Sequence, residues 1–276
     1  MFHGEFNFDL YDALDSALHF QHPEYSGTYH TTNEPITNWV QSGIVDNPRV
    51  LTVAASGDQP LMYASAGASQ VDTFDITVYA CMVMDFKTSA SQSMNYSQYM
   101  TTVQKLCNLE TLELNAPVVQ AINNMPQRTR ALMYNAKMYR PNALSKHDIK
   151  KLSFPTDPQT YAKIQASVHT PFNFIWADLE NVSHYITGKY DIINISNIFD
   201  HYLWFKESLE SIYDTIQKLW SHLNVGGHIL CTTVNFAAVP FLNEIPQRLP
   251  NLHANVLLTD ESPNNLWQAI LIQKTR

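Results

Sequence analysis

The sequence contains little cysteine and little glycine for its length. Its three cysteines, Cys81, Cys107 and Cys231, have no paired spacing, which excludes a disulfide framework and gives no zinc-ligand pattern. We therefore expect no metal site, and reduced thiols that act as small buried hydrophobic groups. With 8 glycines and 14 prolines in 276 residues and no low-complexity run, the composition favours a globular chain over a disordered one.

Long hydrophobic runs are also missing. No stretch approaches the roughly 20 apolar residues that span a bilayer. The first five residues do not open a basic region followed by a long apolar run, as a signal peptide would. The sequence thus predicts a cytoplasmic protein without a transmembrane segment. Because 45% of its residues are hydrophobic, it can bury one sizeable core, with or without a smaller appended part.

Positive charge is scarce. The formal net charge of -8 argues against general nucleic-acid binding, which depends on Lys and Arg that neutralise phosphates. The basic residues are unevenly spread, however, because seven of the 17 lie between Arg128 and Lys151 with Asp148 as the only acid. The simplest interpretation is a solvated helical face. The alternative is a surface for an anionic substrate or a lipid headgroup, and so for peripheral contact with a membrane.

Two parts of the chain show helical patterns only. Residues 1–48 are predicted to form an N-terminal helical segment, with one helix over 8–20 and another that starts near Pro35. Residues 91–169 show helical spacing of leucine and valine and no strand pattern. We expect a helical insertion there.

Strands and helices alternate in the rest of the chain, which predicts one α/β domain over 49–276 that carries the insertion. Short β-branched or apolar runs indicate strands, and apolar spacing of three to four residues indicates helices. The expected strands are 49–54, 70–76, 172–177, 190–196, 228–234, 254–259 and 266–273, with helices over 59–66, 78–86 and 204–223.

This alternation predicts a mostly parallel sheet that is covered on both faces. A tight turn is expected at residues 224–227, before the fifth strand. The last two strands are joined by a turn at 262–265, which is too short for a helix, so they should be antiparallel. Five parallel strands followed by such a hairpin resemble the class I SAM-dependent methyltransferase-like fold, a Rossmann-like mixed sheet of seven strands (SAM, S-adenosylmethionine).

The first chemical motif is the run V-L-T-V-A-A-S-G-D-Q-P at residues 50–60. A strand leads into a loop of small residues and then a helix, so a ligand can approach the backbone and the N–H groups of the helix N-terminus. Only Gly57 matches the G-x-G-x-x-G pattern of dinucleotide enzymes, which favours a ligand without a pyrophosphate, such as SAM, over NAD. The alternative is a plain tight turn. The candidate binding residues are Ala54, Ala55, Ser56, Gly57, Asp58 and Gln59.

The second motif is the acid at the end of the second strand. Asp75 lies 18 positions after Gly57, near the spacing at which an acid binds a ribose diol in Rossmann folds. The alternative is a solvated acid at a strand end. Asp72 lies on the same strand, and a period of two does not choose between residues three apart. Ile76 adjoins this candidate site.

The third motif, W-A-D-L, ends the strand over 172–177. At this position Asp178 can accept a hydrogen bond from the exocyclic amine of adenine while Leu179 flanks the ring. The alternative role of Asp178 is a helix N-cap, and one residue can serve both roles.

The fourth motif follows the strand over 190–196, where the reactive end of a SAM molecule would point. Ser196 and Asn197 are candidate contacts of the ligand. Asp200, His201 and Tyr202 supply a candidate base and an aromatic face for a sulfonium cation. The alternative for His201 is a partly exposed loop histidine. The D/N-P-P-Y/F signature of amino-group nucleic-acid methyltransferases is absent.

Four motifs together resemble one family. They are T-N-E at 32–34, V-L-T-V-A-A-S-G-D-Q-P at 50–60, G-A-x-x-V-D-x-x-D-I at 67–76 and S-N-I-F-D at 196–200. They look like the SAM:diacylglycerol 3-amino-3-carboxypropyl transferases of betaine-lipid synthesis and their uncharacterised bacterial relatives. The resemblance implies SAM as the ligand, with Asn33 or Glu34 near its methionyl end. It also implies attack on the aminocarboxypropyl carbon rather than on the methyl group.

The sequence therefore predicts a SAM-dependent transferase, methyltransferase-like, that moves a methyl or 3-amino-3-carboxypropyl group to a small molecule or a lipid headgroup. Methyl transfer is the commonest use of such a fold, but the fold does not fix the reaction. Two alternatives are a SAM-binding protein without turnover and an NAD-dependent oxidoreductase. The single glycine of the loop disfavours the second.

Overall fold

The computed structural model describes residues 46–107, 114–127, 129–130, 155, 157–167, 169–170, 172–200, 209–234, 239–259 and 267–276. These residues belong to two compact units. The helical unit contains Ala54–Ala66 and the described residues of Asp75–His169. The sheet unit contains the described residues of Pro35–Val53, Gly67–Phe74 and Thr170–Arg276.

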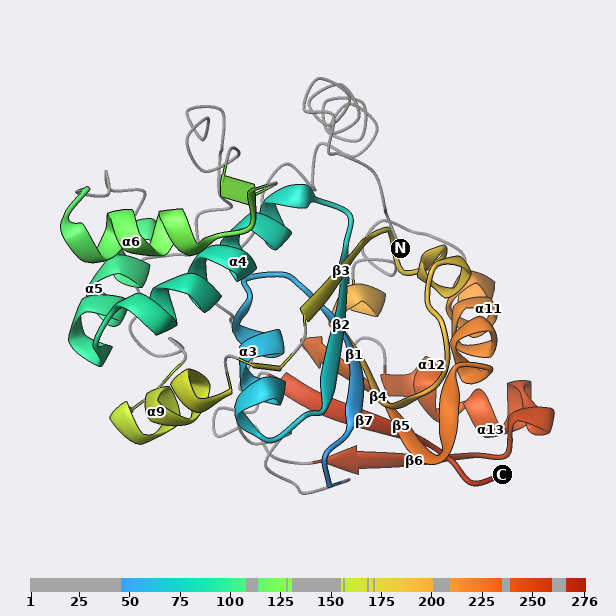
Figure 1. Cartoon of the computed structure of the whole chain (residues 1–276). Helices are drawn as coiled ribbons and strands as arrows, with labels where there is room; N and C mark the ends of the chain where they lie inside the picture. The colour runs from blue at the N-terminus through green and yellow to red at the C-terminus, as the bar shows by residue number, and fades with distance from the viewer. Residues whose placement is uncertain are drawn as a thin grey trace. The chain divides into compact units, whose positions relative to one another are not determined.

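A seven-stranded sheet has the strand order β3-β2-β1-β4-β5-β7-β6 (Figure 1). Strand β1 pairs in parallel with β2 and β4, and β4 pairs in parallel with β5. Strand β7 is antiparallel to both of its neighbours, β5 and β6. This is the strand order of the class I methyltransferase-like fold, so the predicted fold class is confirmed. The strands are β1 (Arg49–Val53), β2 (Gln70–Asp75), β3 (Phe172–Trp176), β4 (Tyr190–Ser196), β5 (Leu223–Val234), β6 (Ala254–Thr259) and β7 (Trp267–Lys274).

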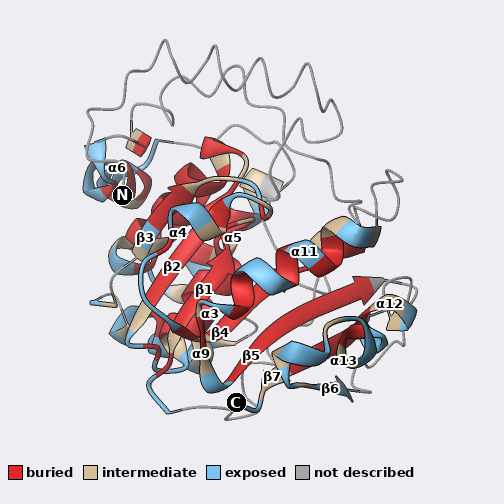
Figure 2. Ribbon diagram, turned by 90° about the vertical axis from the view of Figure 1, so that its right-hand side faces the viewer, coloured by how far each residue is buried: buried red, intermediate tan, exposed pale blue. Residues whose placement is uncertain are grey.

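The central strands are buried on both faces. Every residue of β4 except Asp191 is buried, and β1 is buried from Val50 onward. Successive strand residues point to opposite faces, so an unbroken run of buried residues means that both faces are covered. Figure 2 shows these strands in red along most of their length. This burial on both faces explains why these strands contain continuous runs of Val, Leu and Ile.

Six of the seven strands match their predicted bounds to within one residue at each end, and β5 differs. It begins at Leu223 and includes residues 224–227, where a turn was expected. Two successive pairs with β4 are five residues apart along β5 but only two apart along β4, so β5 accommodates three extra residues. Gly226 has a φ of 83°, which glycine adopts without the clash of a Cβ. The predicted turn is therefore wrong, because its turn-forming residues make an irregularity inside a strand.

Helix α11 (Leu209–Trp220) lies in the sheet unit between β4 and β5 in the sequence. Its buried side chains recur at helical spacing, and its exposed side chains lie on the other side (Figure 2). Ile212, Ile216, Leu219 and Trp220 are buried. The unit also contains the short elements η3 (Val182–His184), α12 (Val239–Asn243), α13 (Ile245–Arg248) and η4 (Pro250–Leu252).

The helical unit is built around α4 (Val78–Ser93). Twelve of its 16 residues are buried, which is typical of a helix that is surrounded by others. It packs against α3 (Asp58–Ser65), α5 (Tyr96–Cys107), α6 (Ala116–Asn124) and α9 (Pro158–Ala166). The predicted helix over 78–86 is thus present but continues for seven more residues.

Side-chain caps fix where the helices of this unit begin. Thr77 Oγ accepts a hydrogen bond from Tyr79 N (3.2 Å) at the start of α4. Asn115 Oδ1 accepts from Val118 N (3.1 Å) at α6, and the carboxylate of Asp157 accepts from two backbone N–H groups at α9. Each cap satisfies donors that have no partner within the helix. Within the described part of residues 91–169, the elements beyond the end of α4 are helical, and none is a strand.

Several predictions fall outside the described residues. They include the helix over 8–20, the helix near Pro35 and the turn at 262–265. The division into an N-terminal segment over 1–48 and an α/β domain over 49–276, with an insertion at about 91–169, stays a prediction.

No helix within the described parts of the chain is long and apolar enough to cross a membrane. Of the basic segment predicted over Arg128–Lys151, only residues 129 and 130 are described, so the surface proposed for this segment lies outside the described residues.

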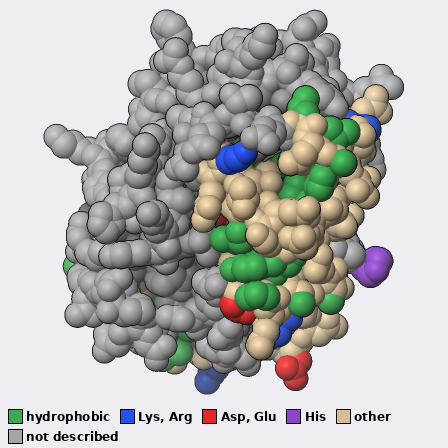
Figure 3. Space-filling model, turned by 90° about the vertical axis from the view of Figure 1, so that its left-hand side faces the viewer, with side chains coloured by type: hydrophobic (Ala, Val, Ile, Leu, Met, Phe, Trp, Pro, Cys, Tyr) green, Lys and Arg blue, Asp and Glu red, His purple; other side chains and the backbone are tan. Residues whose placement is uncertain are grey.

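On the side of Figure 1 where α5, α6 and α9 lie, the described atoms are mainly uncharged, with hydrophobic side chains among them (Figure 3). Leu114 and Val119 are exposed large hydrophobic residues of the helical unit.

Candidate functional site

The loop after β1 has an unusual backbone. Gly57 N donates to Ala54 O (2.7 Å), which closes a tight turn. Ala55 has a φ of 41° and Gly57 a φ of 77°. A left-handed alanine is uncommon, and such residues concentrate at functional sites. Val53 ends β1, so this strained turn follows directly from a central strand of the sheet.

Gly57 is required for space as well as for φ. A Cβ at this position would lie 2.7 Å from the Cα of Met84 on α4. No real Cβ comes so close to a backbone atom, so any other residue would push the loop away from α4. The single glycine of the motif therefore allows the loop to lie directly on the central helix of its unit.

Asp75 joins the end of β2 to this loop. One carboxylate oxygen accepts from Ala55 N (2.9 Å) and the other from Thr77 N (3.1 Å). The side chain is only 9% exposed. Burial raises the pKa of Asp75 to about 6, although backbone N–H groups of Thr77, Ala55 and Ile76 act to lower it. The acid is thus held against the loop, and its charge is sensitive to pH near neutrality.

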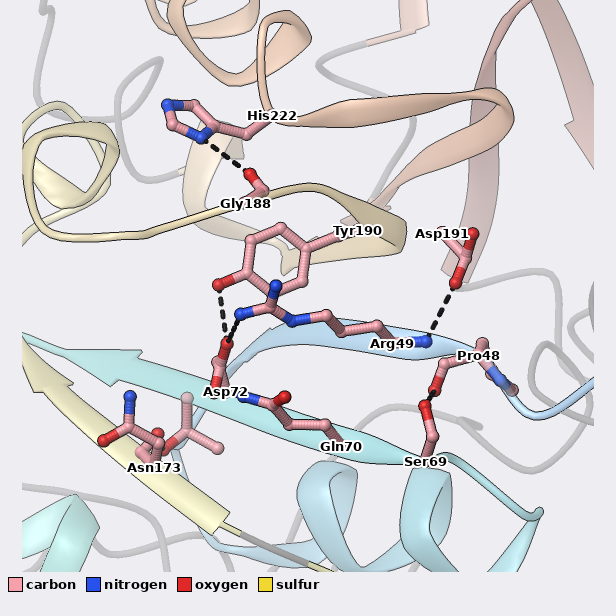
Figure 4. A network of polar contacts seen from close by, with 11 residues as sticks. Pro48, Arg49, Ser69, Gln70, Asp72, Asn173, Gly188, Tyr190, Asp191 and His222 are labelled. Carbon is pink, nitrogen blue, oxygen red and sulfur yellow. Dashed lines mark hydrogen bonds and ion pairs between the residues drawn. The ribbon is translucent and has the colours of Figure 1, made fainter.

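Asp72, the other acid on β2, belongs to a different network (Figure 4). Its Oδ2 accepts from Tyr190 Oη (2.6 Å) and pairs with Arg49 Nη2 (2.9 Å), and its Oδ1 accepts from Gln70 Nε2 (2.7 Å). The Arg49 guanidinium lies 4.6 Å from the centroid of the Tyr190 ring. Burial and the hydrogen bond to Asp72 raise the pKa of Tyr190, which keeps its hydroxyl protonated as a donor. This network explains Asp72 structurally and leaves Asp75 as the acid at the loop.

The side chains of the loop point into the protein. Ser56, Asp58 and Gln59 are each no more than 2% exposed. Asp58 forms a buried ion pair with Lys87 of α4, and Ser56 Oγ donates to Asp58 Oδ2 (3.1 Å). Ala54 is fully buried, whereas Ala55 and Ile76 are half-buried. A ligand at this loop would therefore meet backbone groups rather than the side chain of Asp58.

Asp178 follows β3 in the sheet unit and is exposed. Its two carboxylate oxygens accept from Asn181 N (2.8 Å) and Asn181 Nδ2 (2.9 Å). The carboxylate thus holds the turn that precedes η3, but the residue at the N-cap position of η3 is Asn181. The alternative that Asp178 is a helix N-cap is therefore wrong, because it holds the turn before the helix and does not occupy the cap position. Leu179 beside it is buried.

The end of β4 carries another strained residue. Ser196 has a φ of 53°, and its backbone N–H donates to Asn194 Oδ1 (2.9 Å). Ser196 Oγ lies 3.4 Å from Asn197 Oδ1, and Asn197 is half-buried. Strands β1 and β4 are parallel neighbours, so Ser196 and the last residue of β1 lie at the same edge of the sheet. The chain order reverses between these strands, and this is where ligands bind in open α/β sheets.

Of the three candidate catalytic residues, Asp200 alone is described. It is fully buried and accepts a hydrogen bond from Thr233 Oγ of β5 (2.6 Å). Burial, and then the charge of Asp200, raise the pKa of Cys231. These contacts favour a structural role for Asp200. His201 and Tyr202, like the candidate cofactor residues Asn33 and Glu34, lie outside the described residues.

Lys87 and Met84 were not found from the sequence. Both lie in the middle of α4, and nothing local marks a lysine there as the partner of an acid 29 positions earlier. The sequence gives no signal for Lys87, because Asp85 and Thr88 beside it are polar as well. Among the described residues, no group of three or more His, Cys, Asp and Glu side chains could hold a metal ion.

Comparisons with known proteins give structural similarity at low identity. No family model matches the chain, and no curated protein matches it in sequence. Its structure is similar to that of an rRNA methylase from Streptococcus thermophilus, with a TM-score of 0.43 and 12% identity over 88% of this chain and 98% of that one. It is also similar to that of the rRNA methyltransferase aviRa from Streptomyces viridochromogenes, with a TM-score of 0.47 and 11% identity over 92% of this chain and 88% of that one. A third similar structure is that of the N-methyltransferase NodS from Bradyrhizobium japonicum, with a TM-score of 0.40 and 11% identity over 96% of this chain and 98% of that one.

Proposed function

We propose that this protein is a SAM-dependent transferase whose cofactor binds at the loop of residues 54–58 and at Asp75. The observation that carries this proposal is the bond between the two. The carboxylate at the end of β2 accepts from the N–H of Ala55, within the strained turn that follows β1. A buried acid next to a loop of small residues, in a sheet of this strand order, suits a ribose diol beside the backbone of the loop.

The carboxylate of Asp75 has capacity for a ribose hydroxyl. An ionised carboxylate offers about four acceptor positions, and the backbone N–H groups of Ala55, Thr77 and Ile76 act on this one. At least one position therefore remains for a hydroxyl of the ribose. The loop has only one glycine, and its side chains are turned inward. These features favour SAM, which has no pyrophosphate, over a dinucleotide.

The remaining contacts of the cofactor are assigned as part of the same proposal. Asp178 and Leu179 would lie at the adenine, and Ser196 and Asn197 near the reactive end of the cofactor. Asn33 or Glu34 would meet the methionyl group. Asp178 is exposed and its carboxylate keeps acceptor positions beyond the two that Asn181 occupies, which supports its part in this assignment.

The proposed reaction is nucleophilic displacement at a carbon next to the sulfonium of SAM. A nucleophile on the acceptor forms a bond to that carbon, and the carbon–sulfur bond breaks with its electron pair going to sulfur. Attack on the methyl group releases S-adenosylhomocysteine, and attack on the aminocarboxypropyl group releases methylthioadenosine. Since the sulfonium is already a good leaving group, the protein would act mainly by aligning the reactants.

The acceptor in this proposal is a small molecule or a lipid headgroup. The motifs shared with the SAM:diacylglycerol aminocarboxypropyl transferases favour transfer of the larger group, and His201 or Tyr202 would take the acceptor's proton if it carries one. The formal charge of -8 supports an acceptor other than nucleic acid.

Two labelled forms of SAM test the proposal. The protein is incubated with SAM labelled either in the methyl group or in the carboxyl group, together with separated lipid, small-molecule and RNA fractions of cells. Transfer of the methyl label with release of S-adenosylhomocysteine identifies a methyltransferase, and transfer of the carboxyl label with release of methylthioadenosine identifies the alternative. Asp75→Ala serves as the control with weakened SAM binding and should transfer less label at low SAM concentration. Intact SAM in all fractions contradicts turnover, and label in RNA contradicts the proposed acceptor.

A further inference from the structure

A fully buried lysine connects α4 to the loop. Lys87 forms an ion pair with Asp58, the first residue of α3, and both side chains have no exposed surface. Ser56 Oγ donates to the second carboxylate oxygen of Asp58 (3.1 Å) and lies 3.4 Å from the backbone N of Asp58. The cation on α4 is therefore linked through one carboxylate to the middle of the loop.

The same helix contacts the site at two further places. Met84, one turn before Lys87, lies directly under Gly57, where there is no room for a Cβ. Thr77, at the N-terminal end of α4, donates its N–H to Asp75 and caps the helix with its hydroxyl. The loop and the acid that are proposed to hold the cofactor are thus both fixed to α4.

Stability alone does not account for such a pair. Removing two charges from water is unfavourable, and well-packed apolar residues of similar volume often serve a protein as well or better. Unlike apolar packing, a buried ion pair is a directional interaction, because the acid must meet the cation at a defined angle and distance. Here that directional link ends at Ser56, between the two residues of the turn that have positive φ.

We propose that Lys87 is a positioning residue for cofactor binding. Through Asp58 and Ser56 it holds the backbone of residues 54–58 in the strained conformation that receives SAM, without touching the cofactor. This inference rests on the proposed function. It changes the predicted role of Asp58 from a ligand of the cofactor to the link between Lys87 and the loop.

The test is calorimetric titration of SAM into four proteins. The first two are the wild type and Lys87→Met, which leaves Asp58 buried without its cation. The third is the double variant Asp58→Asn, Lys87→Met, which removes both charges and keeps an acceptor for Ser56. The fourth is Lys163→Met, which removes an exposed lysine from α9 in the same unit and serves as the matched control.

We expect the Kd for SAM to rise at least tenfold in Lys87→Met and at least threefold in the double variant, with a stoichiometry near that of the wild type. Lys163→Met should bind like the wild type. A purely structural role would lower the stoichiometry, which counts folded protein, and leave the Kd of the folded fraction unchanged.

If Lys87→Met does not fold, the double variant still tests the inference, because the double variant buries no unpaired charge. A wild-type Kd in the double variant overturns the inference and leaves the proposed function intact. Absence of SAM binding by the wild type itself overturns the proposed function.

Discussion

Raising the pH from about 5 to about 7 should tighten the binding of SAM to the wild-type protein about tenfold. Asp75 has a pKa raised to about 6 by burial, so the carboxylate that would accept the ribose hydroxyls is mostly protonated at the lower pH and mostly ionised at the higher one. The apparent Kd varies inversely with the fraction of protein that is competent to bind, which gives a factor of about ten between these pH values.

The same shift has an opposite effect on stability. The pKa of Asp75 is raised in the folded protein from its ordinary value of 3.8 to about 6, so the folded protein holds a proton that the unfolded chain has released between these values. Stability therefore falls as the pH rises through this window, by about 3 kcal/mol at about 1.4 kcal/mol per pH unit. Above the window the carboxylate is ionised in both states, and the loss is complete.

The variant Asp75→Asn separates these effects. Its side chain stays neutral, so its unfolding free energy relative to the wild type should improve by about 3 kcal/mol between about pH 4 and pH 7.5. Its affinity for SAM should be weak at every pH. Urea denaturation and calorimetric titration over this range provide the two measurements. A wild-type affinity that is constant with pH, together with a constant stability difference, would refute the reasoning.

Two further substitutions test the geometry of the two units. Gly57→Ala should lower the unfolding free energy by about 2 kcal/mol or more, since alanine disfavours positive φ and its Cβ would overlap Met84, and it should weaken SAM binding as well. Denaturant unfolding and titration check this, and an unchanged protein would show that the loop does not press on α4. Tyr190→Phe should lower the unfolding free energy by about 1.5 kcal/mol, because Asp72 loses a donor. It should leave the Kd for SAM unchanged, since Tyr190 begins β4 and the candidate contacts Ser196 and Asn197 lie at the other end of that strand; a changed Kd would place Asp72 in the site after all.

Much of the sheet was predictable because short apolar runs form its central strands, such as β1 and β4, which are buried on both faces. Six strands were found nearly to the residue, and the antiparallel direction of the last two followed from the short connection between them. The start of β5 was not found, because Asn, Gly and Gly at 224–227 give the same local signal whether they make a turn or an irregularity within a strand. Only pairing with β4 distinguishes the two.

The candidate site was predictable in outline and not in its contacts. The spacing from Gly57 pointed to Asp75, and the structure joins that acid to Ala55. The choice against Asp72 needed the contacts of Tyr190 and Arg49, which are distant in the sequence. The inward direction of Asp58 and its pairing with Lys87 depend on how α3 and α4 pack, which no local pattern reveals.

Titration of SAM into the wild type and into Asp75→Ala tests the central claim most directly. We predict micromolar binding by the wild type at about pH 7.5 and a loss of roughly 1–3 kcal/mol of binding free energy in the variant, because the ribose hydroxyls lose their acceptor. Equal affinity in the two proteins, or no binding by the wild type, would contradict the account.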